Sequence, residues 1–297
     1  FIAEGFPAQP QWESFAEFQQ GETMKGVRRQ MMNGTLPEVC KACTHATRTD
    51  VYKDTFNTRF GHLLKEIEQS TQEDGSTTVK PVFIDYRTDI CNLTCRTCVP
   101  YSSTQWQNHM KRFKEEYEAI DMQDTPAMSN SEKKTLHVQN LRELSQLLAS
   151  EILEEVYFAG GEPTMNPGHM KSLEVLAQNP QAKNITIYYN TNLTLSKEKL
   201  GPWLSALAPF KEVKIHVSID GHGEIAEYVR SGLSWNDFEE KLKLALQYKA
   251  PNTRLVIDPT VTSLFMLQLK EFSEFCLSHN LSITAKAMVS NGLGEHL

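Results

Sequence analysis

The chain has 297 residues, of which 40% are hydrophobic, and its 30 basic and 37 acidic residues leave a net charge of −7. This length and composition can bury the core of one large α/β domain together with a smaller region. The acidic balance argues against a large nucleic-acid-binding surface. The absence of a run of about eighteen apolar residues predicts no membrane span.

The first region of the chain, up to about residue 78, is predicted to be mostly helical. Its expected helices cover residues 13–19, 24–32 and 59–68. The polar stretch 69–78 has the composition of a linker. Before the third helix stand Cys40 and Cys43, whose Cys-x₂-Cys spacing fits a zinc knuckle or a redox dithiol as well as an iron–sulfur site.

From residue 79 onward, predicted strands and helices alternate. Strands are expected near residues 81–86, 155–158, 184–189, 212–219, 254–261 and 281–288. Helices are expected near residues 103–118, 136–150, 168–177, 197–207, 235–248 and 264–279. Six strands that alternate with helices imply a parallel sheet with right-handed crossovers. The polar segment 123–134 is expected to be a loop or an insertion beside the active face.

Three cysteines follow the first predicted strand. Cys91, Cys95 and Cys98 have the spacing Cys-x₃-Cys-x₂-Cys. Three close thiolates can bind three irons of a four-iron cubane and leave the fourth iron open to another ligand. Structural zinc prefers four ligands, usually as two separated pairs, and no fourth cysteine or histidine lies close by in the sequence. The spacing therefore favours an iron–sulfur cluster over a zinc site or three reduced thiols.

A glycine-rich turn follows the second predicted strand, with Gly160, Gly161, Glu162 and Pro163 in sequence. Glycines let a backbone approach a ligand closely and adopt positive φ. Exposed backbone groups at a strand end can pair with the ammonium group of a ligand. The same residues also suit an ordinary strand-to-helix turn, so this motif gains weight only beside the cysteines.

Polar residues end the third and fourth predicted strands. Asn190, Thr191 and Asn192 carry amides and a hydroxyl that suit sugar hydroxyls. Ser218 and Arg230 supply a hydroxyl and a guanidinium that suit a carboxylate, and Asp220 beside them is placed to contact ribose or substrate. Because the carboxyl ends of parallel strands share one face of an α/β barrel, all four motifs are expected to meet there.

Taken together, these motifs resemble those of the radical S-adenosylmethionine (SAM) enzymes, over about residues 80 to 290. The resemblance implies a partial (β/α)₆ barrel, a [4Fe–4S] cluster on the three cysteines, and SAM bound to its open iron. It implies that the Gly-Gly-Glu-Pro backbone meets the methionyl amino group and that Ser218 and Arg230 bind the methionyl carboxylate. Asn190 and Asn192 are then expected at the ribose. Thr97 departs from the family, in which an aromatic residue near the adenine is common at this position.

The resemblance also implies a reaction. Reductive cleavage of SAM would give methionine and a 5′-deoxyadenosyl radical, which takes a hydrogen atom from a substrate. The electron would come from an external reductant of the flavodoxin or ferredoxin type. A peptide or an amino-acid-derived small molecule is the first substrate expected, and a nucleotide or tRNA is the alternative. Two non-enzyme alternatives are a non-catalytic iron–sulfur protein and a zinc-stabilised interaction module.

The segment around Cys40 and Cys43 resembles the auxiliary-cluster segment of the twitch and SPASM subgroup of these enzymes. This implies an N-terminal auxiliary region and linker at 1–78, a radical SAM core at 79–297, and a second [4Fe–4S] cluster with the pair as half of its ligands. The other two cysteines lie further upstream in such proteins, where this sequence has none, and His45 is a candidate substitute. The clustered cysteines favour a reducing, cytoplasmic location.

Overall fold

The computed structural model describes residues 15–38, 59–98, 102–118, 147, 150, 152–284 and 286–287. The chain divides into two compact units, Phe1–Lys80 and Pro81–Leu297. Several sequence predictions lie outside the described residues: Cys40, Cys43, His45, the loop at 123–134, and nearly all of the helix expected at 136–150.

Three α-helices occur among the described residues of the first unit. They are α1 (Phe15–Gln20), α2 (Glu22–Met32) and α5 (Leu64–Ser70), the last preceded by the 3₁₀ turn η1 (Gly61–Leu63). The stretch expected to be a linker folds back on itself, because Thr71 and Thr77 form an antiparallel bridge. Within this turn Gly75 has a φ of +83°, and a Cβ there would lie 2.2 Å from the Lys25 carbonyl oxygen. Only glycine fits this close contact between the turn and α2.

The second unit is built on a six-stranded sheet in which all neighbouring strands are parallel. Its strands, in spatial order, are β1 (Phe83–Thr88), β2 (Glu155–Gly160), β3 (Thr186–Thr191), β4 (Glu212–Val217), β5 (Thr253–Ile257) and β7 (Ser282–Ile283). Spatial order follows chain order, as in a partial (β/α) barrel. The predicted α/β fold with six parallel strands is confirmed.

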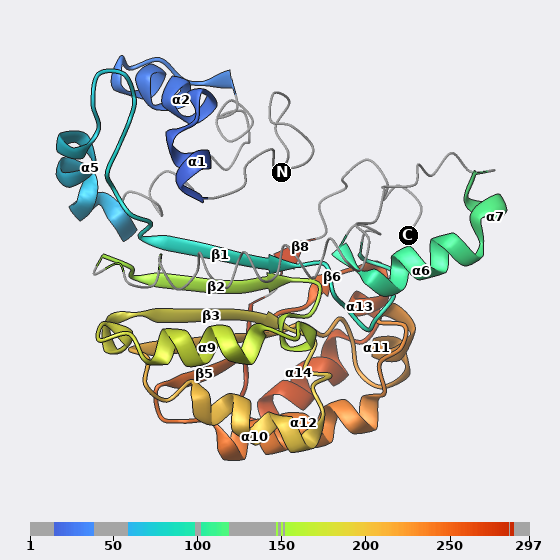
Figure 1. The fold of residues 1–297 in the computed structure, drawn as a ribbon. Coiled ribbons are helices and arrows are strands. Elements are labelled where there is room, and N and C mark those ends of the chain that lie inside the picture. Colours follow the sequence, from blue (N-terminus) through green and yellow to red (C-terminus); the bar gives the residue numbers. More distant parts are fainter. Residues whose placement is uncertain are drawn as a thin grey trace. The chain divides into compact units, whose positions relative to one another are not determined.

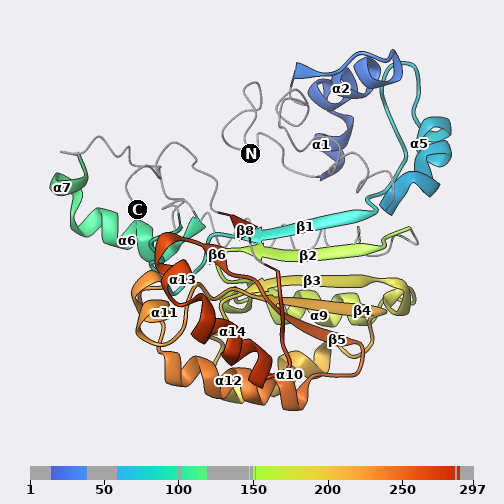
Figure 2. The same ribbon diagram turned by 180° about the vertical axis from the view of Figure 1, so that it is seen from behind.

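Helices connect these strands. They are α6 (Thr104–Arg112), α7 (Lys114–Glu118), α9 (His169–Ala177), α10 (Lys197–Ala206), α11 (Glu224–Val229), α12 (Trp235–Tyr248), α13 (Ser263–Leu267) and α14 (Leu269–Ser278), with 3₁₀ turns η3 (Pro163–Met165) and η4 (Ala182–Asn184). In both views α9, α10, α12 and α14 cover the same face of the sheet (Figures 1 and 2). A substrate could therefore lie on the opposite face of the sheet, which these four helices do not cover.

The helix-covered face carries the core because the strands alternate. On β4, Val213, Ile215 and Val217 are at most 1% exposed, whereas the residues between them are half-buried. The helices supply fully buried side chains such as Trp203 and Phe272. Burying one large apolar side chain contributes about 1.5–3 kcal/mol. This apolar layer fixes the strands whose ends carry the predicted motifs.

Two predicted strands are wrong in length. The strand expected at 254–261 is two strands, β5 and β6 (Thr260–Val261), and the strand expected at 281–288 is β7 and β8 (Lys286–Ala287). β6 and β8 pair in a separate two-stranded sheet. Pro259 lies at the first break, and proline has no N–H with which to continue a ladder.

Two predicted helices are also divided, and one helix was not predicted. The helix expected at 103–118 breaks at Phe113 into α6 and α7, and that expected at 264–279 breaks at Gln268 into α13 and α14. The side chain of Gln268 accepts a hydrogen bond from the His222 N–H (3.0 Å), so this residue connects two loops rather than continuing a helix. The unpredicted helix is α11, which has only six residues.

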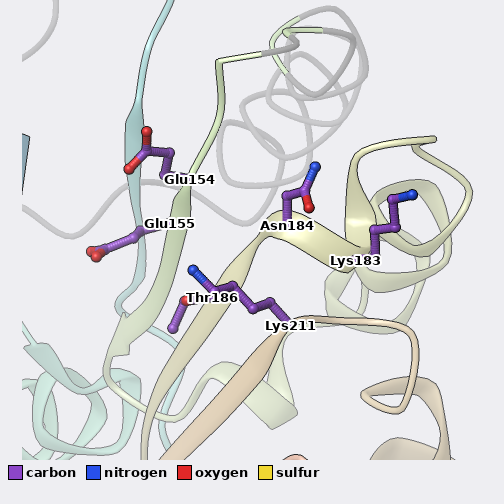
Figure 3. A pocket seen from close by; sticks show the side chains of 6 residues that line it. All are labelled: Glu154, Glu155, Lys183, Asn184, Thr186 and Lys211. Carbon is purple, nitrogen blue, oxygen red and sulfur yellow. The ribbon is translucent and has the colours of Figure 1, made fainter. Parts of the chain in front are cut away.

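A hollow of about 400 Å³ lies at the amino ends of β2 and β3 (Figure 3). It is lined by Glu154, Glu155, Lys183, Asn184, Thr186 and Lys211. The predicted motifs follow the carboxyl ends of the strands, so this hollow lies at the opposite end of the sheet. No helix among the described residues is long and apolar enough to cross a membrane.

Candidate active site

The loop that carries the three cysteines is fastened on one side by α6. The Thr104 hydroxyl donates to the Cys91 carbonyl (3.0 Å) and accepts from the Cys91 N–H (3.2 Å). The Trp106 indole N–H donates to the Cys95 carbonyl (2.9 Å), and the Cys98 N–H closes a turn onto the same oxygen (3.1 Å). The first turn of α6 therefore fixes the backbone beside two of the three cysteines.

On its other side the loop is fastened to the end of α11 and to the segment that follows it. The Thr94 N–H donates to the Ser231 carbonyl (2.9 Å), and the Arg96 N–H donates to the Val229 carbonyl (2.8 Å). The Arg96 guanidinium also stacks on the Tyr228 ring, 4.1 Å from its centroid. The loop is held between two elements that are far apart in the sequence, which gives the thiols a defined backbone frame.

Two of the three thiols are buried, and the charges of the three thiols affect one another. Cys91 and Cys95 are each 8% exposed. Burial raises the pKa of both thiols, and that of Cys95 to about 12, although the charge of Arg230 opposes the rise. Neighbouring Cys98 and Cys91 thiolates raise the Cys95 pKa further. Because metals bind thiolates, loading a metal on this loop must release protons.

These residues fit an iron–sulfur cubane. Three soft thiol ligands lie on one loop, and the guanidinium Nη1 of Arg230 lies 4.0 Å from the Cys95 sulfur. In the described part of the chain, no three cysteine, histidine or carboxylate side chains are grouped to hold a single metal ion. A cubane makes a different demand, because each cysteine binds a different iron.

The Gly-Gly-Glu-Pro turn packs directly on the start of the cysteine loop. The Gly161 N–H donates to the Thr88 carbonyl (2.5 Å), and the Glu162 N–H donates to the Ile90 carbonyl (2.7 Å). Gly160 has a φ of +103°, and a Cβ there would lie 2.2 Å from the Thr88 oxygen; at Gly161 it would lie 2.5 Å from the Ile90 oxygen. Both glycines are required by this close approach of two backbones, whether or not a ligand is bound.

Glu162 fastens this turn to the end of β3. Its side chain is fully buried. Its carboxylate accepts from the Thr164 N–H and hydroxyl (3.1 and 2.5 Å), from the Thr191 hydroxyl (3.0 Å) and from the Asn192 N–H (2.6 Å). Burial raises the pKa of this carboxyl, and the hydrogen bonds from Thr164, Asn192 and Thr191 oppose the rise. The Glu162 carboxylate therefore binds protein groups and holds the turn in place.

The two asparagines have different surroundings. Asn190 is half-buried and opposite His216 in the register of β3 and β4. Asn192 is only 5% exposed. Its Nδ2 lies 3.4 Å from the Asn92 side-chain oxygen and 3.9 Å from the Cys91 sulfur. Asn190 lies on the open face, where a ribose contact is feasible, whereas Asn192 is directed at the cysteine loop.

Arg230 and Asp220 form a buried ion pair beside the cysteines. The Arg230 Nη2 lies 3.0 and 2.9 Å from the two Asp220 oxygens. Asp220 is fully buried and also accepts from the Thr260 N–H (2.7 Å). The Arg230 Nε is buried and has no hydrogen-bond partner among the described residues, so the guanidinium retains a donor for a further anion. Ser218 is half-buried two residues before Asp220.

The open face of the sheet carries a row of polar and aromatic side chains. Across β1 to β5 the register partners are Asp85, Tyr157, Tyr188, Lys214 and Arg254, none of them fully buried. The two tyrosine rings meet edge to face at 6.5 Å, and the Lys214 amine lies 5.2 Å from the centre of the Tyr188 ring. This row can contact a substrate through charge, hydrogen bonds and ring stacking.

The predicted residues in the described part of the chain gather around the carboxyl ends of β1 to β4. The Thr191 hydroxyl, expected to suit a sugar hydroxyl, donates instead to Glu162. Sequence reasoning missed a supporting set of side chains: Asn92, Thr104, Trp106 and Thr194. Asn92 and Thr194 lie within two residues of predicted site residues, which was an available signal. Trp106 and Thr104 carried no such signal, because their role depends on how α6 packs against the loop.

Residues 86–267, more than half of the chain, match the family model of the radical SAM superfamily. The chain belongs to the radical SAM superfamily. The three-cysteine loop offers ligands for the iron–sulfur cluster with which enzymes of this superfamily cleave SAM. The match includes Cys91, Cys95, Cys98, the Gly-Gly-Glu-Pro turn and Arg230.

Two solved structures of SuiB from Streptococcus suis are similar to this radical SAM chain. The one bound to S-adenosylmethionine has a TM-score of 0.46 and covers 89% of this chain; the other has a TM-score of 0.48 and covers 90%. Both are 15% identical in sequence, and the chain spans about half (52%) of the SuiB length. No curated protein matches the chain.

Proposed function

We propose that the protein is a radical SAM enzyme with its [4Fe–4S] cluster on Cys91, Cys95 and Cys98. One observation carries the proposal: the three thiols lie on a single loop, two of them buried, with the Arg230 guanidinium 4.0 Å from the Cys95 sulfur. This places a soft metal-binding group beside a cation that retains an unpaired buried donor. A carboxylate bound to Arg230 would lie beside the cysteine loop, as a SAM molecule chelated by the cluster requires.

The protein's own residues would bind and orient SAM. The carbonyls of Gly160 and Gly161 would accept from the methionyl ammonium group, because their turn packs on the cysteine loop. Ser218 and Arg230 would hold the methionyl carboxylate, with Asp220 positioning the guanidinium through its two oxygens (3.0 and 2.9 Å). Asn190 would contact the ribose. When bound and reduced, the cluster supplies the electron that cleaves SAM into methionine and a 5′-deoxyadenosyl radical.

The first experiment is anaerobic reconstitution with iron and sulfide, followed by dithionite and SAM and an assay for 5′-deoxyadenosine. The matched control is the triple variant Cys91→Ala, Cys95→Ala, Cys98→Ala. Formation of 5′-deoxyadenosine by the parent alone supports the proposal. A protein that takes up a cluster but never cleaves SAM would be a non-catalytic iron–sulfur protein, and a colourless protein that binds zinc would overturn the proposal altogether.

The substrate we propose is a peptide or an amino-acid-derived molecule. The row of Asp85, Tyr157, Tyr188, Lys214 and Arg254 supports this choice, because its charged ends and aromatic centre can pair with the charged and aromatic side chains of a peptide. Short peptides with acidic and aromatic residues should then raise 5′-deoxyadenosine formation above the rate without substrate. Tyr188→Ala should abolish the stimulation and leave the unstimulated rate unchanged. Stimulation by tRNA alone would favour the nucleic-acid alternative.

We further propose that Cys40 and Cys43 belong to an auxiliary [4Fe–4S] cluster of the twitch or SPASM type. Their Cys-x₂-Cys spacing and the surrounding segment support this proposal.

An external flavodoxin- or ferredoxin-type protein would supply the electron to the SAM-cleaving cluster. The exposed Arg96, which lies within the cysteine loop itself, offers a positive charge to such an acidic reductant.

A further inference from the structure

The side-chain amide of Asn192 has a fixed orientation. Its oxygen accepts from the Thr194 N–H (2.9 Å), and the Thr194 hydroxyl lies between this oxygen (2.5 Å) and the Asn92 side-chain oxygen (3.0 Å). Because an amide NH₂ group cannot accept from a backbone N–H, the oxygen must face Thr194 and the NH₂ end must face the other way. That end lies 3.9 Å from the Cys91 sulfur and 3.4 Å from the Asn92 oxygen.

Glu162 ties this amide to the cysteine loop by a second route. Its Oε2 accepts from the Asn192 backbone N–H (2.6 Å), and its own N–H donates to the Ile90 carbonyl (2.7 Å), one residue before Cys91. The Thr191 hydroxyl reaches both carboxylate oxygens at 3.0 Å. Since the Glu162 side chain is fully buried, water cannot replace these bonds. One buried carboxylate therefore helps to hold Asn192 beside Cys91.

Hydrogen bonds to the sulfurs of an iron–sulfur cluster help to set its reduction potential. A donor stabilises the extra negative charge of the reduced cluster, so it raises the potential, and loss of the donor lowers it. Arg230 is the corresponding donor at the Cys95 sulfur, at 4.0 Å. Its replacement would also remove the proposed carboxylate contact, so Asn192 is the residue on which the effect can be isolated.

We propose that Asn192 donates a hydrogen bond to the Cys91 sulfur of the loaded cluster, and that Glu162 and Thr194 are the positioning residues that aim it. The effect is a higher reduction potential, which eases electron uptake. This inference rests on the proposed function, since it needs a cluster on Cys91. Asn192 would thus contact the cluster, whereas Asn190 faces the open side of the sheet.

The test is an anaerobic redox titration of the reconstituted full chain without SAM, with the reduced cluster followed by its electron paramagnetic resonance signal. In Asn192→Leu the ratio of reduced to oxidised cluster at a fixed potential should fall about tenfold, equivalent to about 59 mV for a one-electron couple. Asn190→Leu removes the same amide two residues earlier on β3 and should leave the ratio unchanged. Asn192→Asp keeps the oxygen that Thr194 bonds, removes the donor, adds negative charge, and should lower the ratio further.

Each outcome decides the matter. A lower ratio of reduced to oxidised cluster in both Asn192 variants, with an unchanged ratio in Asn190→Leu, supports the inference. An unchanged potential in the Asn192 variants, or an equal drop in Asn190→Leu, overturns it. If both Asn192 variants fail to hold a cluster that Asn190→Leu retains, Asn192 serves loop folding and the inference also fails. If the parent itself holds no cluster, the proposed function has failed instead.

Discussion

Glu162 shows how a motif residue can act through protein contacts alone. Its buried carboxylate accepts hydrogen bonds from four donor groups on Thr164, Thr191 and Asn192. Glu162→Gln replaces one acceptor oxygen by an NH₂ group that faces these donors. We expect the free energy of unfolding to fall by about 2–3 kcal/mol, as measured by urea denaturation of the metal-free protein.

A matched control for this substitution is Glu174→Gln on α9. The Glu174 side chain is 54% exposed and pairs with Lys171 at 3.0 Å in a surface salt bridge. Its loss should change stability by less than about 1 kcal/mol. Equal effects of the two substitutions would show that the Glu162 network contributes little.

His169 predicts a pH dependence of stability. It is 1% exposed and its Nε2 lies 2.7 Å from the Tyr189 hydroxyl. Burial lowers its pKa from 6.5 to about 4. The unfolded chain therefore binds a proton that the folded chain rejects, so stability is complete above about pH 6.5 and falls as the pH drops toward 4.

The expected loss from His169 between pH 7 and pH 4.5 is about 2–3 kcal/mol. His169→Gln should lack this part of the pH dependence, because glutamine does not titrate. Urea unfolding of both proteins at the two pH values measures the difference. If the free energy of unfolding changed equally with pH in both proteins, the folded protein would accept a proton on His169.

At the scale of elements, the ends of β1 and β2 are held together by backbone contacts that exclude side chains. A Cβ at Gly160 would lie 2.2 Å from the Thr88 oxygen, in a backbone with φ of +103°. Gly160→Ala must separate the two strand ends, so we expect it to lose most of the bound iron after reconstitution and to be destabilised by about 3 kcal/mol or more.

The control for this prediction is Gly201→Ala inside α10, where an added Cβ would meet nothing within 4 Å. Alanine favours a helix over glycine by about 1 kcal/mol, so this variant should be slightly stabilised and should bind iron normally. Iron content and the urea midpoint together distinguish the two substitutions. Normal iron binding in Gly160→Ala would contradict the proposed need for close contact.

The elements also show what the sequence could predict. Alternation of apolar residues located six strands, and their order followed because each helix links neighbouring parallel strands. The break at Pro259 could have been foreseen from its missing N–H, but the break at Gln268 depends on a contact with His222, 46 residues away. The cysteine and glycine motifs identified the active end of the sheet. The approach of the Asn192 amide to Cys91 and Asn92 could not be predicted, since these residues lie about 100 positions away in the sequence.

At the scale of the whole molecule, the two compact units suggest separate tests of separate clusters. If Cys40 and Cys43 help to bind an auxiliary cluster, the reconstituted chain should contain about eight irons, from two cubanes. The double variant Cys40→Ala, Cys43→Ala should contain about four and should still form 5′-deoxyadenosine. Iron and sulfide analysis measures both.

These iron measurements test the auxiliary cluster separately from the cluster on Cys91, Cys95 and Cys98. About four irons in both proteins would contradict the auxiliary cluster while leaving SAM cleavage intact. Loss of 5′-deoxyadenosine together with four irons in the variant would show that the second cluster takes part in the reaction.

The attachment of the cysteine loop to the segment after α11 has a consequence for how the protein is made. Thr94 and its partner Ser231 are 137 residues apart, and a ribosome adds about 5–20 residues per second, so roughly 7–27 seconds separate the emergence of the two. During that interval the three cysteines are present without half of the frame that holds them. Iron supplied early would meet loose thiols open to oxidation. We therefore expect cluster insertion to follow synthesis of the segment after α11, and cells that make this protein faster than they deliver iron should accumulate a folded, metal-free form.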